Sequence, residues 1–89
     1  LQGKYEFAEA TWMLALEEAE DFGENDRRLA FTLEKLSECL WFLNRLDEAL
    51  HYGNRALRVY ERVLGAQHHD VGAIASNMAR IHHLQNNYE

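Results

Sequence analysis

Residues 44–47, near the middle of the 89-residue chain, read Asn-Arg-Leu-Asp and separate two long amphipathic segments. Similar tetrads lie 41 residues before and 42 residues after, Gly-Lys-Tyr-Glu at 3–6 and Asn-Asn-Tyr-Glu at 86–89. Each tetrad combines a residue that tolerates left-handed backbone with an apolar residue and an acid, which is typical of one helix ending and another beginning. Asn44 is expected to cap the start of the segment that follows the tetrad, with Asp47 three residues later as in a capping box.

A second pair of junctions falls between the tetrads, around Gly23 and Gly65, again 42 residues apart. Both glycines are expected to end helices, because glycine adopts the left-handed conformation of a C-terminal cap without strain. The chain contains no proline, the residue that most often interrupts a helix. The junctions predict four helices joined by short loops, and therefore antiparallel in succession, at roughly 4–22, 26–43, 46–64 and 69–85.

Apolar residues recur at steps of three and four in these segments, as on one face of a helix. Alanines hold matching places in two of them, since Ala8 and Ala15 of the first correspond to Ala49 and Ala56 of the third. Small side chains at such places let a neighbouring helix approach closely. The sequence therefore predicts an all-α fold of antiparallel helical hairpins.

Such hairpins, with small residues at these places and a fixed period, resemble the tetratricopeptide repeat, although the period exceeds the usual ~34 residues. Residues 64–72 read Leu-Gly-Ala-Gln-His-His-Asp-Val-Gly, similar to the LG-x-x-H-P-D-V-A junction of kinesin light chains. Residues 33–37 and 75–79 stand where that long-repeat type has its L-N-N-L-A core motif. The resemblance covers nearly the whole chain and implies an α-solenoid with a right-handed superhelix. HEAT-like arrays share a similar period but are not suggested by the paired alanines and the Leu-Gly junction.

The phase of the repeat makes 26–43 and 69–85 first helices, and 4–22 and 46–64 second helices. On this interpretation residues 1–89 are one domain excised from a longer array, in which Leu1-Gln2 ends one helix and Tyr88-Glu89 begins another. The outermost helices should then expose apolar stripes, and self-association into a homo-oligomer is expected. The stripes comprise Tyr5, Trp12 and Phe22 at one end, and Ile74, Met78 and Ile81 at the other.

Segment 26–43 carries two distinct stripes at about 100° per residue. The first is the expected core stripe of Leu29, Leu33, Leu36, Ser37, Leu40 and Leu43. The second contains aromatic and acidic residues, and the family resemblance implies that first helices line a concave, peptide-binding surface. The predicted groove residues are Phe31, Glu34, Lys35, Glu38, Trp41, Phe42, Ser76, Asn77, Arg80 and His83. The alternative for Trp41 and Phe42 is packing against the next helical pair.

The predicted groove also bears on the charge of a ligand. Lys35 and Asn77 stand at the second asparagine of the family's core motif, and only Asn77 keeps the family residue. Glu34 and Glu38 occupy positions where cationic or amide groups would be needed to hold an acidic peptide. A basic or apolar-aromatic peptide therefore fits this groove better.

Composition excludes several classes of function. Fifteen acidic and nine basic residues give a net charge of −6, which speaks against binding to nucleic acid or to an acidic membrane surface. No apolar run approaches the ~20 residues of a membrane span. The acidic residues concentrated in 1–25 are interpreted as a solvated helix face rather than a docking surface. Cys39 is the single cysteine, so an internal disulfide is impossible and a cytoplasmic location is expected.

No motif of an enzyme occurs: there is no phosphate-binding glycine loop, nucleophile elbow or zinc-protease sequence. The five histidines do not predict a metal site, since their spacing offers two ligands and no third. No catalytic residue and no cofactor are therefore expected. The predicted function is a protein-protein interaction scaffold that binds a peptide segment of a protein partner. The alternatives are a structural or self-assembling array segment without a client, and the regulatory part of a larger enzyme.

Overall fold

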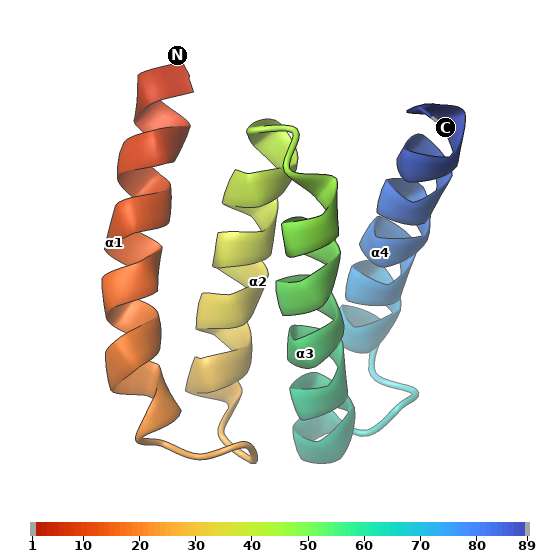
Figure 1. Ribbon diagram of the computed structural model, residues 1–89. Helices are drawn as coiled ribbons and strands as arrows, with labels where there is room; N and C mark the ends of the chain where they lie inside the picture. The colour runs from red at the N-terminus through yellow and green to blue at the C-terminus, as the bar shows by residue number, and fades with distance from the viewer. Residues whose placement is uncertain (1, 89) are drawn as a thin grey trace.

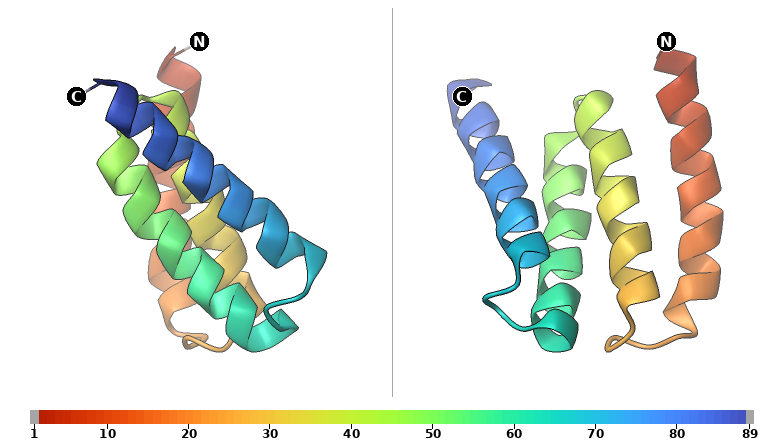
Figure 2. Two further views of the ribbon diagram at one scale, coloured as in Figure 1. Left: turned by 90° about the vertical axis from the view of Figure 1, so that its right-hand side faces the viewer. Right: turned by 180° about the vertical axis from the view of Figure 1, so that it is seen from behind.

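The computed structural model describes residues 2–88, with the side chains of residues 3–86, and this part of the chain forms four α-helices (Figure 1). They are α1 (Gln2–Glu20), α2 (Arg27–Phe42), α3 (Leu46–Leu64) and α4 (His69–Tyr88). Successive helices run antiparallel and lie side by side in chain order (Figures 1 and 2). The predicted all-α solenoid of helical hairpins is confirmed.

Two of the helix ends follow the chemistry expected from the sequence, and a third is capped by an aspartate. Gly23 and Gly65 both have left-handed backbone, with φ of 91° and 90°, in the turns after α1 and α3. The Gly65 N–H donates to the Glu61 carbonyl at 3.0 Å and so closes the last turn of α3. At the start of α2, the Asp26 carboxylate accepts from the Arg28 N–H at 2.8 Å. The two glycines and the aspartate therefore fix the lower end of the first hairpin and the exit from α3.

The tetrads behave differently from the prediction. Asn44 has a φ of 61° and ends α2, rather than capping α3, whose N-cap residue is Arg45. The Asn44 and Arg45 N–H groups donate to the Trp41 and Leu40 carbonyls at 2.9 and 2.8 Å, the bonding pattern of a Schellman motif. Gly3 lies inside α1 and the asparagines of the last tetrad lie inside α4, so neither tetrad breaks a helix. Leu1 and Glu89, assigned to neighbouring helices, lie outside the described residues.

The core lies where α2 packs between α1 and α3. Leu29, Leu33 and Leu36 of the predicted core stripe are fully buried, whereas Leu43 at the end of the stripe is only half-buried. The Ser37 hydroxyl, also buried, donates to the Ala49 carbonyl of α3 at 2.7 Å. A buried hydroxyl is tolerated because this bond replaces its contact with water.

Close approach of helices is concentrated on α3. Ala49 and Ala56 have no exposed surface, in agreement with their predicted role as small contact residues. At Gly53 an added Cβ would overlap the Met78 side chain and lie 2.9 Å from the Ser37 hydroxyl oxygen. The missing side chain at Gly53 is therefore the space into which α4 inserts Met78.

Part of the acidic charge of the first 25 residues is paired with arginines of the second hairpin. Arg55 of α3 contacts Glu20 and Glu24 at 2.6 and 2.7 Å, and Arg45 contacts Glu9 at 2.7 Å. Such exposed pairs are screened by solvent and contribute little to stability. They indicate that this charge is used partly to orient α1 against α3, in addition to solvating the helix.

The apolar stripes expected at the two outermost helices are largely wrong. Ile74, Met78 and Ile81 are buried, because they face α3 and the neighbouring hollow rather than the outer side of α4. Tyr5 and Trp12 are half-buried, and Phe22 is 43% exposed.

A different part of α1 presents apolar surface to solvent. Phe7 is 76% exposed and Leu14 is 66% exposed, with Met13 beside them at 39%. Helix α1 is therefore apolar on two sides, one packed on α2 and the other uncovered. Within residues 2–88, no helix is both long enough and apolar enough to cross a bilayer.

Candidate functional site

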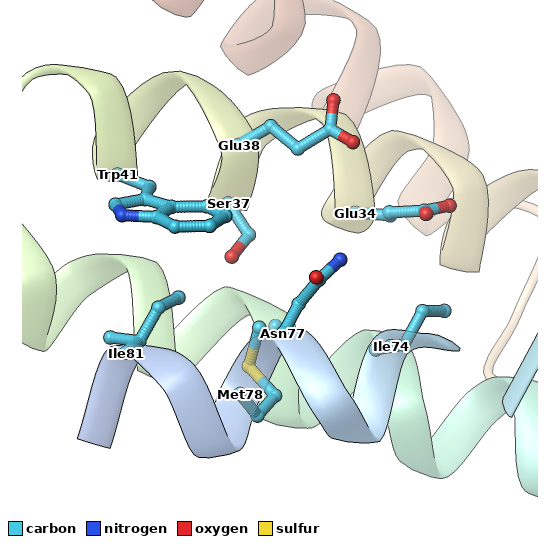
Figure 3. A pocket seen from close by; sticks show the side chains of 9 residues that line it. Glu34, Ser37, Glu38, Trp41, Ile74, Asn77, Met78 and Ile81 are labelled. Carbon is cyan, nitrogen blue, oxygen red and sulfur yellow. The ribbon is translucent and has the colours of Figure 1, made fainter. Parts of the chain in front are cut away.

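A groove runs between α2 and α4, which lie parallel on either side of α3. It consists of two adjoining hollows that share Glu34 and Ile74, and we call it the α2–α4 groove. The first hollow is lined by Glu34, Ser37, Glu38, Trp41, Gly53, Ile74, Asn77, Met78 and Ile81 (Figure 3). The second is lined by Arg27, Phe31, Glu34, Lys35, Tyr60, Asp70, Ala73 and Ile74.

The end of the groove nearest the C-termini of α2 and α4 is aromatic and apolar. The Trp41 indole lies at this end with Ile81 opposite, and Asn77 stands between this pair and Glu34 (Figure 3). Trp41 is half-buried, and the Arg80 guanidinium lies 5.7 Å from the centre of its ring. This end offers a flat hydrophobic contact next to an amide that can both donate and accept hydrogen bonds.

The middle of the groove is occupied by a half-buried carboxylate, Glu34. It accepts a hydrogen bond from the Tyr60 hydroxyl at 3.2 Å. Burial raises the pKa of Glu34; the Tyr60 hydrogen bond lowers it, Glu38 and Asp70 raise it, and Lys35 lowers it. Burial and the charge of Glu34 likewise raise the pKa of the Tyr60 hydroxyl.

The cations of the groove are placed around its edges. The Lys35 ammonium contacts the Glu38 carboxylate at 3.5 Å and lies 5.4 Å from the centre of the Phe31 ring. Arg80 lies over Trp41. Among the described residues, Glu34 therefore has a hydroxyl partner but no ion-pair partner.

Six of the ten predicted groove residues line the α2–α4 groove: Phe31, Glu34, Lys35, Glu38, Trp41 and Asn77. Ser76, Arg80 and His83 lie on the exposed side of α4, and of these Arg80 reaches the groove by its contact with Trp41. The assignment of these three residues to the groove rests on the 42-residue offset between the two helices. The sequence thus placed the α2 wall more accurately than the α4 wall.

Phe42 does not line either hollow of the α2–α4 groove, so the prediction for this residue is corrected. Its ring stacks on Tyr5 of α1, with centroids 4.6 Å apart and planes inclined by 13°. Consecutive helical residues differ by about 100° in direction, so Phe42 reaches α1 while Trp41 lines the groove. The two rings nevertheless stack, with centroids 6.1 Å apart and planes inclined by 21°. Phe31 bridges the two sides, since it lines the second hollow and also contacts the edge of Trp12 at 5.9 Å.

The groove floor was missed because only first helices were expected to contribute. Tyr60 and Gly53 come from α3, the second helix of the hairpin. Gly53 could have been predicted as a contact residue, because it lies on the same apolar face as Ala49 and Ala56. A small residue there lets a neighbouring helix approach closely. No sequence signal pairs Tyr60 with Glu34, which is 26 residues away.

Glu34 should reduce the stability of the fold at neutral pH. Because its pKa is raised in the folded state, its stabilising contribution is present at low pH and is lost as pH rises through the glutamate range. We expect Glu34→Gln to have a higher free energy of unfolding than the wild type at neutral pH, with the difference shrinking near pH 4. The Gln carbonyl can still accept from Tyr60.

Urea denaturation at the two pH values measures this difference. Glu17→Gln, at an exposed position of α1, removes the same charge outside the groove and should change stability little. A Glu34→Gln protein less stable than the wild type at neutral pH would contradict the assigned burial of this carboxylate.

The junction before α4 gathers the ligand atoms of His68, His69 and Asp70 within 4.8 Å of one another. The Nδ1 atom of His68 accepts from the Asp70 N–H at 3.1 Å, so that nitrogen caps the first turn of α4. The His69 side chain is 87% exposed. His68 therefore serves the junction before α4, and of the three side chains only that of His69 is largely exposed.

Helical hairpins stacked in chain order around small contact residues define an α-solenoid repeat protein. The sequence profile of the tetratricopeptide repeat family matches residues 1–62 and again residues 45–89, which together span the chain. The chain belongs to the tetratricopeptide repeat family. No curated protein matches it closely enough to serve as a relative. All of α3 except its last two residues falls in both matched ranges, in agreement with its contacts to α2 and α4.

Proposed function

We propose that the chain is a non-catalytic scaffold module whose α2–α4 groove binds a peptide segment of a partner protein. Tetratricopeptide repeats are in general protein-protein interaction modules. The observation that carries the proposal is Trp41, a large aromatic ring that is half-buried at one end of the α2–α4 groove. Aromatic residues in partly desolvated pockets provide most of the binding free energy in many interfaces.

The polar residues near Trp41 support a peptide rather than a small apolar ligand. Asn77 lies in the wall opposite α2 and can bond the N–H and C=O groups of an extended backbone. Glu34 and Glu38 provide side-chain selection along the same wall as Trp41. We further propose that the repeats are of the long, kinesin-light-chain-like type and that the module works in the cytoplasm without a cofactor.

Binding to an array of immobilised peptides tests the proposal. Trp41→Ala and Glu38→Lys should each lower the affinity for the captured peptides by about tenfold or more. Such a loss is typical of residues that dominate an interface. Phe7→Ala is the matched control, because it removes an aromatic ring that is 76% exposed on the opposite edge of the fold. If both groove variants retain every peptide, the groove is not the binding site.

A second candidate function is self-assembly through α1. It is favoured by the uncovered apolar surface of Phe7, Met13 and Leu14, since monomeric proteins seldom leave such side chains together in water. Sedimentation over a wide range of concentrations should then reveal a homo-oligomer that Leu14→Glu dissociates. A monomer at every concentration would exclude this function.

A further inference from the structure

We propose that the segment bound in the α2–α4 groove presents a lysine or arginine side chain whose charged group pairs with Glu34. This inference rests on the proposed peptide binding and names the chemistry of the partner. It goes beyond the general mode of binding, because it assigns one carboxylate as the group that selects the ligand. The alkyl part of the same side chain would lie along the wall of the groove at Ile74, beside Glu34.

Glu34 lies where the two hollows of the groove meet. Its side chain is half-buried and lines both hollows, so any peptide that follows the groove passes over it. The Tyr60 hydroxyl satisfies one carboxylate oxygen at 3.2 Å and leaves the negative charge without an ion-pair partner among the described residues. A carboxylate removed from water without a cation is costly, and a cation brought by the ligand reverses that cost.

The cations near Glu34 are mostly engaged by other groups. Glu38 is already paired with Lys35 at 3.5 Å, and Arg80 is held over the ring of Trp41 at the far end. The remaining charged residues of the second hollow are two carboxylates, Glu34 and Asp70, and one cation, Arg27. The Asp70 carboxylate is also contacted by the His69 Nε2 at 3.0 Å. The groove therefore keeps an excess of negative charge at its centre, and an acidic peptide would meet like charge there.

Apolar side chains line the groove beside the Glu34 carboxylate. Ile74 and Trp41 lie on either side of the centre, one next to Glu34 and the other at the aromatic end (Figure 3). Lysine and arginine bury their methylene groups on apolar surface while the charged group reaches a polar partner. An acid flanked by apolar and aromatic surface thus fits a basic side chain better than a neutral one.

Selection from a random dodecapeptide library on the 89-residue chain tests the inference. The selected peptides should share a lysine or arginine at one position. Replacing that lysine by norleucine, which keeps the methylenes and removes the charge, should weaken binding to the wild type by about tenfold. The same replacement should weaken binding to Glu34→Gln by no more than about twofold, because the partner charge is already absent. Glu17→Gln should behave as the wild type.

The outcomes separate the two proposals. If selected peptides lose affinity for Trp41→Ala but are neutral or acidic, the peptide groove stands and the pairing with Glu34 is wrong. If they are basic but norleucine weakens the wild type and Glu34→Gln equally, the cation pairs with another carboxylate and the inference is overturned. If no selected peptide responds to Trp41→Ala, the proposed function fails and the inference with it. If norleucine leaves binding to the wild type unchanged, the inference is also overturned, and this comparison needs no altered protein.

Discussion

Replacing Leu33 with alanine should lower the free energy of unfolding by about 2–5 kcal/mol, the usual cost of truncating a fully buried leucine. Leu33 has no exposed surface and belongs to the cluster that joins α2 to its neighbours on both sides. A domain of this size has a total stability of about 4–13 kcal/mol, so this one substitution removes a large part of it. Urea denaturation followed by far-ultraviolet circular dichroism measures the change.

Leu14→Ala provides the matched control for Leu33→Ala. The side chain is the same, but in α1 it is 66% exposed, and its truncation should change stability by no more than about 0.5 kcal/mol. Equal losses for the two variants would mean that Leu14 is covered in solution, as expected if α1 mediates self-assembly.

Gly53→Val should be the most damaging change at the α3–α4 contact, with a loss of about 1–3 kcal/mol from overpacking. The valine side chain would occupy the space filled by Met78 and crowd the Ser37 hydroxyl, which is held by its bond to Ala49. Gly53→Ala should cost less, because the end of the flexible Met78 side chain can move and alanine favours a helix by about 0.5–1 kcal/mol over glycine.

Gly72→Ala is the control for Gly53, since Gly72 also lies within a helix but has open space around it. We expect this variant to be more stable than the wild type by about 0.5–1 kcal/mol, by helix propensity alone. Thermal unfolding monitored by circular dichroism can compare all three glycine variants. If Gly53→Val were as stable as Gly72→Ala, Met78 could not be packed against α3 at this position.

Most of the fold could be predicted from the sequence because its signals are local and repeated. The bounds predicted for 46–64 coincide with those of α3, where an acidic first turn and Gly65 mark both ends. Of the paired alanines, Ala49 and Ala56 of α3 are fully buried as predicted, whereas Ala8 and Ala15 of α1 are only half-buried. These features depend on the backbone conformation and size of single residues, which the sequence states directly.

The errors at the tetrads arose because one residue type can serve two kinds of helix end. Asparagine both caps helix N-termini and adopts left-handed backbone at C-termini. At Asn44 the second role applies, since the turn to α3 requires a φ of 61°. Asn86 continues α4, and its sequence neighbours carry no glycine that would end the helix.

The candidate site could be predicted only in part, because a groove depends on three helices at once. Glu34, Glu38 and Trp41 share one stripe of α2, which helical periodicity alone identifies. The contribution of Tyr60 required the packing of α3 behind that stripe, and the sequence does not state it. The likeness to kinesin light chains stays a prediction, as does the pairing of the groove with a peptide.

Occupation of the α2–α4 groove by a peptide can be detected by nuclear magnetic resonance of the two tryptophan indoles. Trp41 lines the groove, whereas Trp12 lies on α1 and contacts it only through Phe31. On addition of a library-selected peptide, the Trp41 indole N–H signal should shift in proportion to occupancy while that of Trp12 moves much less. A peptide that shifts Trp12 and leaves Trp41 unchanged would place the binding site on α1 and contradict the account.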